Sequence, residues 1–366
     1  MKKVYAPTII LVLVFCLAPV HALAQGQGVI EGQVVSGAAN GGSVESLTVT
    51  LHVFAGMEEQ PSQTITTDAE GRFHFEGLIT EANHVYTLRL DYQGVEYGSD
   101  LLTFSEGETT LSVPIQVYES TENDEVVSIE RTHIFVDFEE DKLLLGEMYI
   151  FSNSSDRIYI GVEEVAEGQR GTLHLFLPTE AEGLTFEGGE LGQRFFETDR
   201  GFVDTWSLPP GQASGRLIFS YSLPYDPSGY DLTREIPYPL KAINVLVAEV
   251  GVDVTSDQLT LEGSRGMQGQ SYLNLSGQNL NKGERLSMHF SGSPGDRVVE
   301  GGEPVPAQPP QPGDRSLLRW AALGLVVLAV GFALGYPLLR RQSKEANEAA
   351  VEETEDDGRR SSSDSG

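Results

Sequence analysis

The stretch TTDAEGRFHFEGL, residues 66–78, decides the fold of the N-terminal part of the chain. Phe73 and Phe75 alternate with polar residues, which is the two-residue period of a half-buried β-strand. Asp68 and Gly71 stand at the two ends of a tight turn, where such residues are common. The stretch therefore predicts a turn that joins two strands.

The same alternation recurs on both sides of this turn. It places Val49, Leu51 and Val53 on one face of a strand and predicts a further strand over Val85–Leu90. Strands joined by short polar turns bury a core by packing one sheet on another. Residues 28–118 are therefore predicted to form one β-sandwich domain.

A family resemblance rests on two runs of residues in this region. Ile30-Glu31-Gly32-Gln33-Val34 opens it, and Thr67-Asp68-x-x-Gly71-x-Phe73-x-Phe75-x-Gly77-Leu78 follows. Together they resemble the carboxypeptidase regulatory-like family over residues 28–118. The resemblance implies a small prealbumin-like β-sandwich that stabilises or binds, and it brings no catalytic residues. The zinc peptidase domain that gives the family its name has no counterpart in the sequence.

A second region, residues 125–292, also has the character of strands separated by turns rich in Pro and Gly. We predict strands over Ile129–Phe138, Leu143–Phe151, Leu173–Leu177, Leu217–Tyr221, Ile243–Val254 and Leu286–Phe290. They predict a second β-sandwich, or two small ones. Leu177-Pro178 and Pro209-Pro210-Gly211 also resemble uncharacterised bacterial envelope proteins that combine a regulatory-like domain with a C-terminal anchor.

Two apolar segments predict how the chain meets the membrane. Residues 1–24 have a basic start, an apolar run and Ala22-Leu23-Ala24, the small-x-small pattern of a cleaved signal peptide. Residues 320–339 carry no charge and would make a helix of about 30 Å, the thickness of the hydrocarbon core. Arg340 and Arg341 follow this span and mark the cytoplasmic side. We therefore expect a single-pass plasma membrane protein with its N-terminal domains extracytoplasmic.

The segments on either side of this span are polar. Residues 293–316 are rich in Pro and Gly and are predicted to be an extended stalk. Residues 340–366 combine acidic residues with a Ser-rich end, a composition that cannot build a core. They are predicted to be a disordered, acidic cytoplasmic tail.

Composition excludes several classes of function. The net charge is −30, and so acidic a surface repels nucleic acid. The single cysteine, Cys16, lies in the predicted signal peptide, so the mature chain has no disulfide, thiolate metal site or cysteine nucleophile. No Gly-x-Ser-x-Gly elbow and no P-loop occur. The glycines at 263, 266 and 269 lack the spacing of a dinucleotide site and indicate a flexible loop.

The histidines and acidic clusters offer few candidates for a metal or acid–base site. Four histidines, His52, His74, His174 and His289, fall on the polar phase of predicted strands, where we expect solvated side chains. His133 differs because it shares its phase with Phe135 and Asp137. The acidic runs at 139–141 and 163–164 lack the ligand order of a calcium loop and are interpreted as solvated turns. We therefore assign no catalytic, cofactor-binding or metal-binding residue and expect no cofactor.

These observations predict a non-enzymatic envelope protein. Its two tandem β-sandwich domains would stand on the stalk, close to the bilayer, and bind or support another envelope protein or complex. The alternative is a polysaccharide-binding or adhesive protein, because aromatic residues such as Phe54, Phe135 and Phe176 fall on the polar phase of strands and Trp206 belongs to the exported part. An enzyme with an unrecognised carboxylate site is the third class considered.

Overall fold

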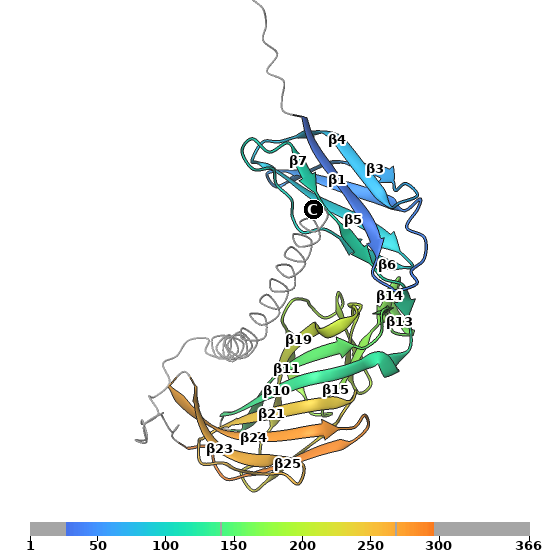
Figure 1. Ribbon diagram of the computed structural model, residues 1–366. Coiled ribbons are helices and arrows are strands. Elements are labelled where there is room, and N and C mark those ends of the chain that lie inside the picture. Colours follow the sequence, from blue (N-terminus) through green and yellow to red (C-terminus); the bar gives the residue numbers. More distant parts are fainter. Residues whose placement is uncertain (1–26, 140, 268, 296–366) are drawn as a thin grey trace, which may run out of the picture. The chain divides into compact units, whose positions relative to one another are not determined.

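The computed structural model of the protein describes residues 27–139, 141–267 and 269–295. These residues form two compact units, one of 27–35 with 43–117 and the other of 36–42 with 118–295. Figure 1 shows both units as assemblies of strands. Within the described ranges no helix is long and apolar enough to cross a bilayer. The predicted signal peptide, transmembrane span and tail lie outside these ranges, as does the stalk from residue 296 onward.

The N-terminal unit consists of two four-stranded sheets. In the first, β1 lies between β4 and β7 and also pairs with β8; β1 runs antiparallel to β4 and parallel to β7. In the second, the strand order is β3-β2-β5-β6. The bounds are β1 Gln27–Ser36, β2 Thr48–Ala55, β3 Glu58–Thr66, β4 Arg72–Ile79, β5 His84–Tyr92, β6 Val95–Gly98, β7 Thr110–Ser112 and β8 Ile115–Val117.

One hydrophobic core joins the two sheets of this unit. Ile30, Phe73 and Phe75 come from the first sheet, and Leu51 and Leu88 come from the second; all five are buried. The alternation predicted from the sequence is therefore confirmed on these strands. The arrangement is sandwich-like, with each sheet burying one face.

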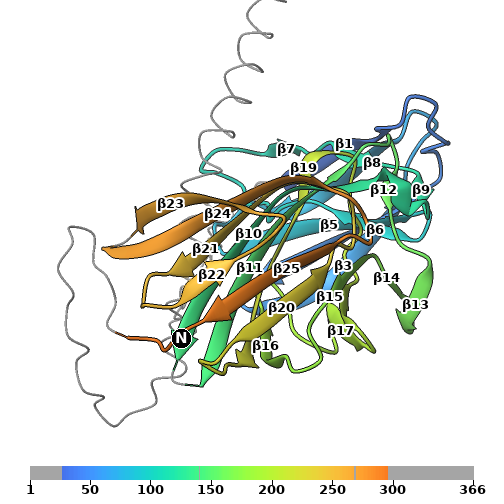
Figure 2. The same cartoon turned by 90° about the horizontal axis from the view of Figure 1, so that it is seen from below.

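The C-terminal unit is built on a seven-stranded sheet of order β16-β19-β11-β10-β21-β24-β23. Its central strand β10 pairs antiparallel with β11 and parallel with β21. Figures 1 and 2 both show β10, β21 and β24 side by side. The bounds are β10 Val127–Glu139, β11 Lys142–Asn153, β16 Glu182–Phe186, β19 Gly211–Pro224, β21 Leu240–Ala248, β23 Thr260–Met267 and β24 Gln270–Leu280.

Smaller sheets complete this unit. Two are three-stranded, with orders β15-β18-β17 and β20-β25-β22, and two are pairs, β12-β9 and β13-β14. The bounds are β9 Ser120–Thr121, β12 Ile158–Tyr159, β13 Glu163–Ala166, β14 Gln169–Gly171, β15 Leu173–Phe176, β17 Phe195–Thr198, β18 Gly201–Asp204, β20 Tyr230–Glu235, β22 Asp253–Thr255 and β25 Arg285–Ser291, with a single 3-10 turn at Asp124–Val126.

Aromatic side chains fill the core between the large sheet and the three-stranded sheets. The ring of Phe219 on β19 lies 4.9 Å from that of Phe202 on β18, centroid to centroid. Phe138 on β10 lies 6.0 Å from Phe290 on β25 in the same way. Both three-stranded sheets therefore pack on one face of the large sheet, and this unit too is sandwich-like. The chain is mainly β, as predicted.

Two predictions for this unit are wrong in detail. The strand predicted over Ile243–Val254 is two strands in different sheets, because Gly251 adopts a positive φ between β21 and β22. The glycines expected in a flexible loop instead belong to the hairpin of β23 and β24. Gly263 sits at a register shift with φ of 102°, and Gly269 with φ of 77° lies in the turn. Such glycines mark bulges and turns of a sheet.

Candidate functional site

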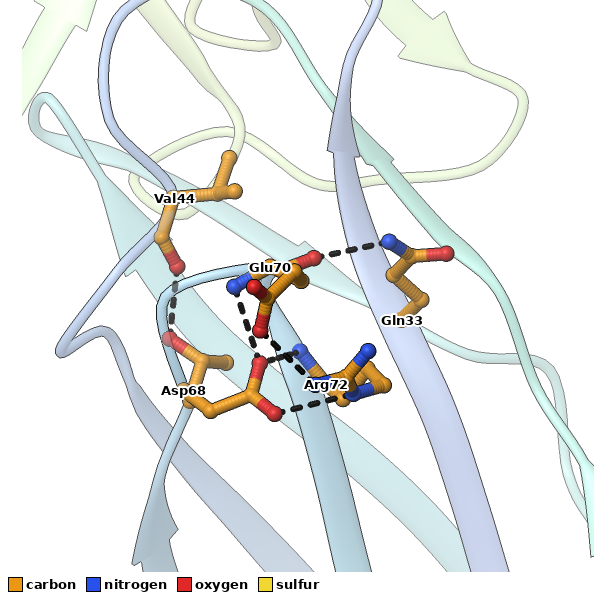
Figure 3. Close-up of polar contacts among 6 residues, drawn as sticks. Gln33, Val44, Asp68, Glu70 and Arg72 are labelled. Carbon is orange, nitrogen blue, oxygen red and sulfur yellow. Dashed lines mark hydrogen bonds and ion pairs between the residues drawn. The ribbon is translucent and has the colours of Figure 1, made fainter.

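The turn at residues 68–71 is held by a closed set of hydrogen bonds (Figure 3). Oδ1 of Asp68 accepts from the backbone N–H groups of Glu70 (3.0 Å) and Arg72 (2.8 Å). Oδ2 accepts from Nε of Arg72 at 2.9 Å. The Arg72 amide bond, together with the weaker Glu70 bond, holds the pKa of Asp68 below its usual value. These bonds make the Asp68 carboxylate part of the hairpin turn.

An open groove of about 970 Å³ runs beside this turn. Its charged residues are already engaged with each other: Arg72 pairs with Asp68 and Glu70, and His74 lies 3.7 Å from a carboxylate oxygen of Glu31. The charged side chains that line the groove are therefore already paired with neighbouring side chains of opposite charge. Nothing in it points to one ligand.

The other histidines predicted to be solvated occupy polar surroundings. Nδ1 of His52 lies 3.0 Å from Oε1 of Glu59, and Nδ1 of His289 lies 2.7 Å from Oδ1 of Asp231. His174 is half-buried. Among the described residues, no group of three His, Cys, Asp or Glu side chains could hold a metal ion.

A buried ion pair crosses the core of the C-terminal unit. Glu147 on β11 is fully buried, and its carboxylate pairs with the guanidinium of Arg234 on β20, which is also buried. The hydroxyls of Tyr149 and Tyr221 donate to the two carboxylate oxygens at 2.9 and 2.7 Å. The remaining guanidinium contacts include the carbonyl oxygen of Phe176 at 3.1 Å. Every charged group has a partner, which is the condition under which such a cluster is tolerated in a core.

Burial dominates the electrostatics of this cluster. It lowers the pKa of Arg234 to about 10 and raises the pKa of Tyr149 and Tyr221 far above their ordinary value. At neutral pH the arginine therefore stays charged and the phenols stay protonated. The sequence contains one signal for the cluster: Glu147 interrupts the apolar strand Leu143–Phe151. Its charged groups and hydroxyls bond to one another inside the core.

An exposed tryptophan rests on a fixed arginine in the same unit. The guanidinium carbon of Arg194 lies 3.6 Å from the centroid of the Trp206 ring. Arg194 is itself held by Asp204, which is buried, through two bonds of 2.8 and 2.6 Å. Trp206 is 61% exposed. The sequence analysis noted Trp206 as a tryptophan of the exported part. It did not predict that Arg194 would hold the exposed ring in place.

His133 and Phe135 do not lie on a solvated face. The side chain of His133 is 2% exposed and that of Phe135 is 1% exposed. The expectation that Phe135 belongs to an exposed aromatic surface is therefore wrong, because β10 is the central strand of seven and is buried on both faces. Of the other aromatics expected there, Phe54 is half-buried, and half-buried Phe176 carries the guanidinium of Arg200 at 4.2 Å.

His133 contributes to the wall of a cavity of about 410 Å³ on the β10, β21, β24 and β23 side of the large sheet. Neither ring nitrogen of His133 has a hydrogen-bond partner. Asn244 pairs with His133 across the sheet, and Ser276 pairs with Asn244. Arg131 on β10 and Arg265 on β23 line the same cavity. We take this His133 cavity as the candidate site.

Burial and like charge act together on the histidine. Desolvation, followed by the positive charges of Arg131 and Arg265, lowers the pKa of His133 to about 4. The ring is therefore neutral at pH 7, with one nitrogen as donor and the other as acceptor. No described carboxylate lines the cavity, and the hydroxyl of Ser276 donates to Glu262 at 2.6 Å. The site has the groups to bind a ligand and lacks a carboxylate base.

Comparison with known proteins yields no family. No family model and no curated protein matches the chain. A DUF3823 family protein from Parabacteroides merdae ATCC 43184 matches with 12% identity and a TM-score of 0.18, over 55% of this chain and 98% of that one. The full-length RrgB pilus protein from Streptococcus pneumoniae matches with 8% identity and a TM-score of 0.17, over 79% of this chain and 65% of that one. Likenesses of this size establish neither a shared fold nor a shared function.

Proposed function

We propose that the protein is a non-enzymatic, single-pass envelope protein that presents two tandem β-sandwich domains near the membrane surface to bind another envelope protein or complex. The composition of the His133 cavity carries this proposal. Its lining includes two arginines, a neutral histidine and side-chain amides, and no described carboxylate. Such groups recognise a ligand, whereas hydrolytic chemistry needs a nucleophile with a base beside it.

The organisation of the whole chain supports the same function. The predicted signal peptide at 1–24 and span at 320–339 would place the described units outside the plasma membrane. The predicted stalk at 293–316 would keep them close to the bilayer, and the tail at 340–366 would be cytoplasmic. The N-terminal unit, 28–118 in this proposal, would be a carboxypeptidase regulatory-like module, with 125–292 as the second domain.

Photo-crosslinking in intact cells tests the binding function. A photo-reactive residue replaces one exposed side chain at a time: Met57 or Leu101 in the first unit, Val162 or Leu261 in the second. If a protein partner binds, some of these positions should give a crosslinked adduct of the same mass. The positions that give no adduct serve as matched controls. If none of the four positions gives a reproducible adduct with an envelope protein, the proposed function is wrong.

Polysaccharide binding is the alternative, and the stacked Trp206 favours it. Flat exposed aromatic rings provide a large contact surface at low entropic cost. In a Trp320→Phe background Trp206 is the one remaining tryptophan of the chain, so its fluorescence reports directly on that surface. A saccharide-dependent change that disappears in Trp206→Ala would support this alternative, and a glycan screen without any change would remove it.

A further inference from the structure

We propose that the His133 cavity is a binding site for an oxyanion, the carboxylate or phosphate group of a small ligand. The inference rests on the cavity alone and does not depend on the proposed membrane attachment. Its residues belong to the C-terminal unit and come from four adjacent strands of the seven-stranded sheet.

The first observation is the unsatisfied histidine. A buried polar group without a partner destabilises the fold, and both ring nitrogens of His133 are in this state. The buried carboxylate of Glu147 in the same unit accepts two hydroxyl groups and an arginine. The His133 ring forms part of the cavity wall, so an anion bound there would lie beside a ring whose N–H group has no acceptor.

The second observation is the charge around the ring. Arg131 and Arg265 form no ion pair with any described residue, in a chain with 54 acidic and 24 basic side chains. Their positive charges reach His133, because both act on its protonation. Two guanidinium groups left unpaired in so acidic a protein form a local positive region. Guanidinium groups match carboxylate and phosphate oxygens with paired hydrogen bonds.

The third observation concerns size and donors. About 410 Å³ exceeds the space that a single water or chloride ion fills and suits a small molecule. Asn244 and Gln278 add amide donors to the wall. Glu262 accepts a hydrogen bond from the hydroxyl of Ser276, which is one of the lining residues. Shape, charge and donors therefore all favour an oxyanion over a cation.

Titration calorimetry on the purified full chain tests the site with two probes, inorganic phosphate and succinate, at constant ionic strength set with chloride. Binding of either probe is expected, and the stronger one identifies the ligand as phosphate-bearing or carboxylate-bearing. Arg265→Gln should weaken that binding at least tenfold. Arg285→Gln is the matched control, because Arg285 also lacks an ion pair with the described residues but lines a different cavity.

The variants are expected to fold, because Arg265 is exposed on the edge strand β23. Unchanged melting temperatures without anion check this. The ring nitrogens of His133 should shift in NMR spectra when the probe is added, which places the anion at the cavity without any substitution. The proposal is overturned if neither probe binds, if Arg265→Gln and Arg285→Gln bind equally well, or if the His133 signals do not move.

Discussion

Glu147 and Arg234 form an ion pair in the interior of the C-terminal unit, and the hydroxyls of Tyr149 and Tyr221 complete the hydrogen bonds of the carboxylate. The pair connects β11 of the large sheet with β20 of a three-stranded sheet. It therefore links the two layers of this unit by a polar cluster within an apolar core.

Removing one charge of this pair should be far more harmful than removing both. Glu147→Gln leaves the guanidinium of Arg234 buried without its counter-charge, which should cost about 3–5 kcal/mol of unfolding free energy. The double variant Glu147→Leu/Arg234→Met removes both charges and should recover most of this loss. Hydrogen exchange of the β11 amides, measured as a function of urea concentration, gives the unfolding free energy of both variants.

Glu58→Gln is the control for this comparison, because Glu58 is exposed on β3. It should change stability by less than about 0.5 kcal/mol. A single variant at Glu147 as stable as the wild type, or a double variant no better than the single one, would contradict the role given to the pair.

Two glycines with similar backbones should respond differently to an added methyl group. Gly71 and Gly77 have φ values of 79° and 75°, so alanine is strained at both. At Gly71 the new Cβ atom would lie 2.3 Å from the carbonyl oxygen of Val34, whereas nothing lies within 4 Å at Gly77. Gly71→Ala should therefore lose about 1–3 kcal/mol more than Gly77→Ala, as overpacking does.

Hydrogen exchange of the β1 and β4 amides measures this difference in the N-terminal unit. The two strands pair next to the turn, and the backbone N–H of Val34 donates to the carbonyl oxygen of Gly71 at 2.8 Å. Equal effects of the two substitutions would show that the turn tolerates a side chain at residue 71.

His133 should make the C-terminal unit less stable in acid. Its pKa is about 4 in the folded chain and near the ordinary value of 6.5 in the unfolded one. Between these values the unfolded chain binds the extra proton, so the unfolding free energy falls as pH drops from about 6.5 to 4, by up to roughly 3 kcal/mol for this group. Arg131 and Arg265 are the charged groups that act on the ring.

Carboxylates titrate in part of the same range, so the comparison with His133→Gln isolates the histidine. The stability difference between the two proteins should change with pH over this window. NMR titration of the His133 ring reports its pKa directly, and bound phosphate should raise that pKa. A ring that titrates near 6.5 in the free protein would contradict the burial described for it.

Much of the fold was predictable because apolar and polar residues alternate along strands that bury only one face of a sheet. Phe73 and Phe75 are buried and His74 is exposed, as their alternation requires. On β10 both phases are buried, so alternation carries no information about His133 or Phe135. The sequence-based prediction also joined β21 to β22 across Gly251, since hydrophobicity continues through the break.

The candidate site was not predictable for a different reason. Its residues are Arg131 and His133 on one strand and Asn244 and Arg265 on two others, and only the sheet order β10-β21-β24-β23 brings them together. Parallel pairing of β10 with β21 spans more than a hundred residues of sequence. The spacing of residues along the chain cannot predict contacts between such distant strands. Glu147, in contrast, is visible in the sequence as a charged residue in an apolar strand.

We propose that both described units lie outside the membrane while the C-terminal tail lies in the cytoplasm. Removal of residues 1–24 would leave a mature chain without cysteine, so a single introduced thiol reports its own location. Met57→Cys places it on a fully exposed side chain of the first unit, and Ser363→Cys places it in the predicted tail. In spheroplasts, a membrane-impermeant maleimide should label Met57→Cys at once and Ser363→Cys only after detergent is added. Labelling of both without detergent, or of Ser363→Cys alone, would contradict the account.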